Sequence, residues 1–190
     1  MASPADDALL ADLAAGREEA FERLYDLFGA RLLRAARCIC ASREEAEDAV
    51  QDVFLALVRA GPALKEVRNL NAYLFSAAHR AAVRRAAGRR HERSIEGRAN
   101  GRAAPEQSRN LANCGTPPPD RLNRALEALP AEQREVLALK VDGELTFEEI
   151  GGLLNVSPNT AASRYRYALE KLRDALRPGT SNTEETGHGG

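Results

Sequence analysis

The apolar positions in the first half of the chain recur every three or four residues, which is the spacing of one face of an α-helix. Three segments show this spacing: Phe21, Leu24, Tyr25, Phe28, Leu32 and Ala36, then Ala46, Ala49, Val50, Val53, Phe54 and Leu57, then Tyr73, Leu74, Ala77 and Ala81. Ser42 and Glu45 form a capping box in front of the second segment, which Gly61 ends, and Asn71 suits the N-terminal cap of the third. The pattern predicts three amphipathic helices packed into one bundle.

The second half of the chain predicts four further helices by the same spacing. Their apolar positions are Leu122, Leu126 and Leu129, then Val136, Leu137 and Val141, then Ile150, Leu153 and Leu154, then Tyr165, Leu169, Leu172 and Leu176. Thr146 and Glu149 form a second capping box, and Ser157 places a capping hydroxyl directly before Pro158. A tight turn at residues 154–157 joins the last two helices, which gives them the layout of a helix-turn-helix.

The periodicity disappears over residues 93–120, where Gly, Pro, Asn and Ser collect. This composition predicts a flexible linker, and the Gly, Ser, Thr and Glu of residues 178–190 predict a disordered tail. The predicted organisation is an all-α fold of two small helical domains, residues 1–92 and residues 121–177.

Composition agrees with helical cores, because 44% of residues are hydrophobic, many of them alanine, while aromatics make up 5% and Trp is absent. No run reaches the roughly 20 apolar residues that span a bilayer, and the N-terminus lacks a signal-peptide layout. We expect a cytoplasmic protein without membrane insertion. The spacing of Cys38, Cys40 and Cys114 fits neither a disulfide framework nor a zinc site, so we expect reduced thiols and no metal or cofactor.

The last predicted helix carries a set of polar side chains on its first turns that suit DNA binding. They are Asn159, Thr160, Ser163, Arg164 and Arg166. Arginine can form two parallel hydrogen bonds with guanine in the major groove and asparagine can do so with adenine, while Ser and Thr reach phosphates or bases. The alternative is an ordinary helical hairpin with a solvated polar face.

Charge is distributed unevenly along the chain, although its formal net value is −1. Acids exceed bases before residue 60, and bases exceed acids from there to residue 102. The basic stretch follows a helix that bears Tyr73, Phe75 and His79, and rings beside cations suit the stacking and neutralisation of single-stranded DNA. A solubilising basic face is the alternative interpretation.

Together the two halves resemble the extracytoplasmic-function (ECF) sigma factors of the sigma-70 family. The segment EAEDAVQDVFLAL at residues 45–57 resembles their region 2.2, and NAYLFSAAHR at residues 71–80 resembles their regions 2.3 and 2.4. Residues 126–176 resemble region 4 through the motifs ALP, QREV, EEIG and SPNTAASR. The resemblance covers nearly the whole chain except the linker and the tail.

This resemblance implies a factor that binds core RNA polymerase and directs transcription from specific promoters, with three groups of site residues. The acidic helix face would bind the β′ clamp helices through Glu47, Asp48, Gln51 and Asp52. The minus-ten element would be captured and opened by Tyr73, His79, Arg80, Arg84 and Arg85. The minus-35 element would lie against the five polar residues of the last helix, the β flap would be a further contact, and an anti-sigma factor is an additional partner that the family admits.

The sequence departs from the family at several promoter-reading positions. Arg80 and Arg84 stand where the family often has Asn and Asp, and Tyr73 stands at a common Trp position. Ala162 and Tyr167 stand where the family frequently has basic residues, and Arg166 stands where it commonly has an aromatic residue. The promoter sequence therefore cannot be transferred from relatives.

Two other classes remain open from the residues alone. One is a stand-alone helix-turn-helix regulator that binds symmetric operators as a dimer, and the other is a helical protein-interaction adaptor. No enzymatic activity is expected, because the three histidines are scattered and no nucleophile and base are paired in a recognisable motif.

Overall fold

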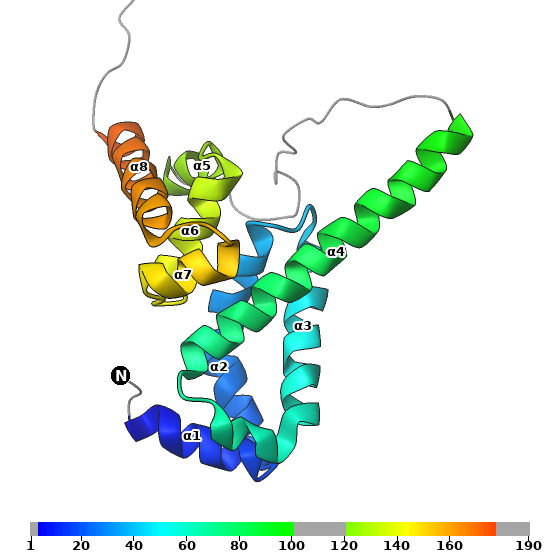
Figure 1. Cartoon of the computed structure of the whole chain (residues 1–190), viewed down its shortest axis with the longest axis vertical. Helices are drawn as coiled ribbons and strands as arrows, with labels where there is room; N and C mark the ends of the chain where they lie inside the picture. The colour runs from blue at the N-terminus through cyan, green and yellow to red at the C-terminus, as the bar shows by residue number, and fades with distance from the viewer. Residues whose placement is uncertain (1–3, 101–120, 178–190) are drawn as a thin grey trace, which may run out of the picture.

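The computed structural model describes residues 4–100 and 121–177, and in these ranges it contains helices and no strand. The helices are α1 (Pro4–Ala14), α2 (Glu18–Arg37), α3 (Arg43–Ala60), the short 3₁₀ helix η1 (Gly61–Glu66), α4 (Leu70–Asn100), α5 (Arg121–Glu127), α6 (Ala131–Val141), α7 (Phe147–Leu154) and α8 (Pro158–Leu176). Helices α1 to α4 form an N-terminal domain and α5 to α8 a C-terminal domain (Figure 1). The predicted all-α fold of two helical domains is confirmed.

The predicted capping box is complete at the start of α7, whereas at the start of α3 only its Ser42 half forms, because the Glu45 carboxylate accepts from the Ala41 amide instead of the Ser42 amide. Ser42 Oγ accepts a hydrogen bond of 3.1 Å from the Glu45 amide at the start of α3. At α7, Thr146 Oγ1 accepts from the Glu149 amide at 3.2 Å, and the Glu149 carboxylate accepts from the Thr146 amide at 2.8 Å. These bonds satisfy backbone donors that the first turn of a helix leaves unpaired.

Helix α1 was not predicted by the sequence pattern. Its residues Leu9, Leu10 and Leu13 are buried, and the helix packs against η1 and the start of α2. Three apolar side chains on so short a helix give a weak periodic signal, which explains why it was missed.

Helix α4 continues through residues 93–100, where the sequence pattern predicted the beginning of the linker. In Figure 1 its C-terminal half extends away from the other helices. No proline interrupts α4, and the first proline after it is Pro105, so no residue in this stretch removes a backbone donor from the helix. The rest of the predicted linker and the predicted tail lie outside the described residues.

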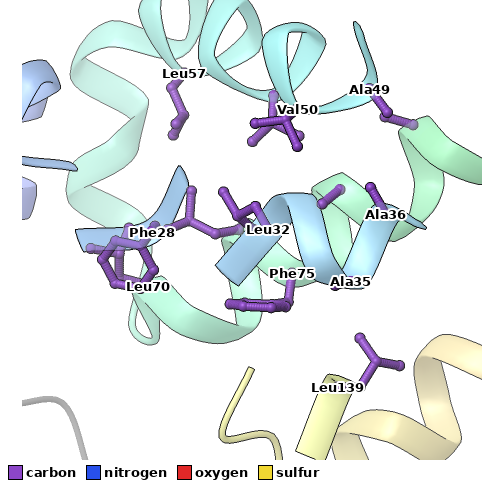
Figure 2. Close-up of a cluster of buried hydrophobic side chains, with 14 of the residues drawn as sticks. Phe28, Leu32, Ala35, Ala36, Ala49, Val50, Leu57, Leu70, Phe75 and Leu139 are labelled. Atoms are coloured by element: carbon purple, nitrogen blue, oxygen red, sulfur yellow. The ribbon is translucent and has the colours of Figure 1, made fainter. Parts of the chain in front are cut away.

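The two domains pack together through α6, which lies against α2 and α4. Phe75 is fully buried, and Figure 2 shows Leu139 of α6 pointing toward Phe75 and Ala35 of the N-terminal domain. Gly143, in the turn after α6, allows this close approach, because a Cβ there would lie 2.5 Å from the Leu139 carbonyl oxygen and 3.1 Å from a Phe75 ring carbon. The apolar cores of the two domains are therefore continuous.

Charged and polar pairs surround this apolar contact between the domains. Arg31 bonds to Glu144 at 2.7 Å, Arg34 to Asp142 at 2.6 Å, and His79 Nε2 to Glu135 at 2.7 Å. Asn69 donates to Glu149 at 3.0 Å. All four carboxylates belong to α6, to α7 or to the turn between them, and their partners are two arginines, an imidazole and an amide. The contact is therefore complementary in charge as well as in shape.

Candidate nucleic-acid interface

The structure brings the five predicted DNA-reading residues to the N-terminal half of α8. Ala161, Ala168 and Leu172 are buried on the inner face of the helix. Asn159, Thr160 and Arg166 are exposed, and Ser163 and Arg164 are half-buried. At about 100° of rotation per residue, positions 159, 163 and 166 lie opposite the buried face. The packing of the domains therefore leaves the outer face of α8 open to a ligand.

Two of the five residues already have partners within the C-terminal domain. Arg164 forms an ion pair of 2.6 Å with Glu132 at the start of α6. Thr160 Oγ1 lies 2.8 Å from Ser157 Oγ, which also accepts from the Thr160 amide and so caps α8. The sequence pattern did not reveal the contact with Glu132, because nothing in it shows which side of α8 faces α6.

Arg166 has a different environment on the outer face of α8. Its guanidinium lies over the ring of Tyr167, 5.7 Å from the ring centre, and it forms no ion pair within the described chain. An arginine that stacks on an adjacent ring is ordered while keeping its hydrogen-bond donors for a ligand. Arg166 is therefore the cation of α8 best placed to reach a base edge or a phosphate.

Helix α7 holds α8 at a fixed angle through close backbone packing. Ile150 is fully buried, and the Phe147 and Tyr165 rings pack 5.8 Å apart. A Cβ at Gly151 would lie 2.8 Å from the Val156 carbonyl oxygen and 3.2 Å from the Pro158 nitrogen. Asn155 takes the left-handed conformation that ends α7, with φ of 55°. These contacts form the helix-turn-helix that the sequence predicted.

The residues predicted to face the minus-ten element do not share one surface. Arg80 and Arg84 are exposed on α4, and Tyr73 is half-buried about two turns before Arg80 and about three turns before Arg84. The His79 side chain is only 12% exposed, because α6 covers it and Glu135 bonds to it. Arg80 and Arg84 are open to a ligand in this arrangement, whereas His79 is part of the contact between the domains.

Arg85 faces α3 and bonds to two of the predicted polymerase-binding acids. Its Nε and Nη2 donate to Asp52 Oδ2 at 3.0 and 2.8 Å, and its Nη1 donates to Asp48 Oδ2 at 2.9 Å. One turn further along α4, Arg89 bonds to Glu45. A ladder of ion pairs thus joins α3 to α4, with the acids spaced three and four residues apart and the two arginines four residues apart.

The four predicted polymerase-binding residues lie on one side of α3. Glu47, Asp48 and Gln51 are exposed, and Asp52 is half-buried. Glu47 pairs with Arg43 one turn earlier at 2.6 Å. The face is acidic and accessible, although its carboxylates are already in contact with arginines of the chain.

The thiols of Cys38 and Cys40 are shielded from solvent and remain protonated. Burial raises the pKa of each thiol to about 11. A protonated thiol is a poor nucleophile and a poor metal ligand. Among the described residues there is no group of three or more His, Cys, Asp or Glu side chains arranged to hold a metal, and no helix long and apolar enough to cross a bilayer. Cys114 lies outside the described residues.

Family models match both domains of the chain. Residues 24–92 match sigma-70 region 2, and residues 120–172 match sigma-70 region 4. The two matches fall on the two helical domains, and the second contains the helix-turn-helix.

The similarity to two known proteins extends over most of the chain. It is 31% identical over 180 residues to the ECF RNA polymerase sigma factor SigD of Mycobacterium tuberculosis, covering 90% of this chain and 83% of that protein. It is 30% identical over 175 residues to SigK of the same organism, covering 90% of this chain and 92% of that protein.

Two solved structures are similar in fold. CnrH, in complex with the cytosolic domain of CnrY, has a TM-score of 0.57 at 25% identity and covers 90% of this chain and 97% of CnrH. RpoE of Bartonella quintana, in complex with the anti-sigma factor NepR, has a TM-score of 0.57 at 22% identity and covers 82% of this chain and 94% of RpoE. The order of the two domains, the helix-turn-helix and the identity with SigD and SigK together show that this chain is an ECF RNA polymerase sigma factor of the sigma-70 family.

Proposed function

We propose that this sigma factor binds core RNA polymerase in the cytoplasm through the acidic face of α3 and directs it to promoters through α4 and α8. The observation that carries the proposal is the open outer face of α8, where Asn159, Ser163 and Arg166 project from a rigid helix-turn-helix. The acidic side of α3 and the basic side of α4 supply two chemically opposite surfaces on the other domain.

The outer face of α8 would enter the major groove of the minus-35 element. A helix of this width fits the groove, and base edges there distinguish all four base pairs. Ser157 and Thr160 lie at the N-terminus of α8, where backbone amides favour a phosphate. These groups would set the register of the helix on the duplex while Asn159 and Arg166 read bases.

The exposed part of α4 would hold the minus-ten element with Tyr73, Arg80 and Arg84. His79 joins this surface only when α6 moves away from α4, because Glu135 now bonds to its ring. We therefore propose that the C-terminal domain separates from the N-terminal domain when polymerase places the two promoter elements apart. The predicted linker would permit this separation, and polymerase would then set the effective concentration of each domain at its element.

The acidic face of α3 would bind the β′ clamp helices, and the C-terminal domain would contact the β flap. A carboxylate binds well to an arginine of a partner, particularly where the guanidinium donates two parallel hydrogen bonds to it. CnrH, similar in fold, is seen with the cytosolic domain of CnrY, and RpoE is seen with the anti-sigma factor NepR. On these likenesses we propose that an anti-sigma factor binds this chain.

The function is tested by transcription in vitro with purified core polymerase and a library of genomic fragments, with start sites mapped. We expect start sites that require this protein and share two sequence elements at a fixed separation. Core polymerase alone is the control. If the protein adds no start site, or binds symmetric half-sites without polymerase, the proposal is wrong and a stand-alone regulator is favoured.

Replacement of Arg166 by alanine should weaken use of such a promoter by about 1–3 kcal/mol, because a two-bonded arginine on a base edge contributes that much discrimination. The measurement is promoter affinity of the holoenzyme, determined on the mapped promoter and on versions with single base changes. The loss should disappear when the base pair read by Arg166 is changed. Lys171→Ala removes the same charge from a later turn of α8 and should leave base preference unaltered; an equal loss there would show that only net charge matters.

A further inference from the structure

The guanidinium of Arg85 joins two carboxylates that lie one turn apart on α3. Three of its nitrogen atoms donate, at distances between 2.8 and 3.0 Å, to Oδ2 of Asp48 and Oδ2 of Asp52. A planar guanidinium has its donors in a fixed fork, so one side chain holds both acids in a defined direction. Lysine carries the same charge but lacks that fork.

The two carboxylates nevertheless remain accessible to a partner. Their side chains are 55% and 42% exposed, against 32% for Arg85. All three bonds from Arg85 go to Oδ2, and Oδ1 of each acid accepts no hydrogen bond from the described chain. Each acid therefore keeps one oxygen for an external donor while the other is held by Arg85.

The same bonds turn Arg85 away from the surface of Arg80 and Arg84. Those two arginines are exposed, and Arg80 bonds only to the Ser76 carbonyl oxygen of its own helix. Arg85 would have to give up three charge-assisted bonds before it could contact a phosphate. Its position therefore favours a role at the acidic face.

We propose that Arg85 is a positioning residue for polymerase binding, which orders the Asp48 and Asp52 carboxylates with one oxygen of each left for basic side chains of core polymerase. This inference rests on the proposed function, because it assigns the acidic face of α3 to the polymerase. It adds a role for α4, namely that an arginine of this proposed DNA-binding helix orders the carboxylates of the neighbouring protein-binding surface on α3. Two like charges one turn apart repel each other, so without the fork they would adopt separate rotamers and lose order before binding.

The test is the affinity of full-length Arg85→Lys for purified core RNA polymerase, measured without DNA. We expect about five- to tenfold weaker binding, because charge is retained and only the fork is lost. In the Asp48→Asn, Asp52→Asn background, the further change Arg85→Lys should have no effect, because it acts through those two acids. Arg23→Lys is the matched control, because Arg23 is exposed on α2 and lies outside the proposed binding residues, and it should bind polymerase as the wild type does.

Three outcomes separate the inference from its premises. If the wild type does not bind core polymerase, the proposed function fails. If the wild type binds and Arg85→Lys binds equally well, or if it weakens binding in the double-Asn background too, the positioning role is wrong. Thermal unfolding of each variant is followed alongside, and should change little because exposed ion pairs contribute weakly to stability. Arg85→Gln lacks both the fork and the charge, and it should bind core polymerase at least as weakly as Arg85→Lys does.

Discussion

Replacement of Phe75 by alanine is expected to lower the free energy of unfolding by about 3–5 kcal/mol, the range for a large aromatic removed from a close-packed core. The ring is fully buried and contributes to the core that the two domains share. A ring carbon of Phe75 would lie 3.1 Å from a Cβ at Gly143, so the turn after α6 packs directly against the ring. Its loss should both destabilise the N-terminal domain and loosen the C-terminal domain from it.

Urea unfolding followed by circular dichroism measures the first effect. Val83→Ala is the matched control, because Val83 lies on the same helix but is 43% exposed, and it should change stability by well under 1 kcal/mol. The second effect is measured by the distance between labels on α3 and α8, which should become broadly distributed in the Phe75 variant. A loss below about 1.5 kcal/mol would mean that the ring is not part of a close-packed core.

Replacement of Gly151 by alanine is expected to disrupt the helix-turn-helix. The new Cβ would lie 2.8 Å from the Val156 carbonyl oxygen and 3.2 Å from the Pro158 nitrogen. Both are backbone atoms, so no side-chain rotation can relieve the contact. Relief of this clash requires α7 and α8 to move apart, at a cost of about 1–3 kcal/mol. Because α8 carries the residues that we propose to read DNA, we expect at least a tenfold loss of minus-35-dependent transcription.

Gly152→Ala is a matched control at the next position of α7. A Cβ at Gly152 meets nothing within 4 Å, and alanine favours a helix by up to about 1 kcal/mol over glycine. This variant should be as stable as the wild type or more stable, with transcription unchanged. Equal behaviour of the two glycine variants would show that the turn is not packed as the structure has it.

The local features of the C-terminal domain could be predicted because short-range chemistry specifies them. Thr146 and Glu149 bond reciprocally as a capping box requires, and Ser157 before Pro158 starts α8. The buried and exposed sides of α8 follow from its helical period. The positions of Asn159 and Arg166 on the outer face were therefore open to prediction, whereas the pairing of Arg164 with Glu132 depends on how α6 lies beside α8.

In the N-terminal domain, nearness in the sequence did not predict which residues share a surface. His79 and Arg85 were grouped with Arg80 and Arg84 because all four occur within six residues of one helix. A helix of this length turns more than once in that interval, so its residues face different neighbours. His79 faces α6 and Arg85 faces α3, which leaves Arg80 and Arg84 as the exposed pair.

By itself the sequence determined every described helix except α1 and η1, several of the helix ends and the presence of two helical domains, since periodicity, caps and helix-breaking residues act within a few positions of one another. Tertiary structure decided which helix faces which. Three contacts join residues more than thirty positions apart in the sequence. Helix α6 packs on Phe75 and covers His79, and Arg85 bonds to Asp48 and Asp52. No local pattern encodes such pairs, because they depend on how whole helices pack once their apolar faces are buried together.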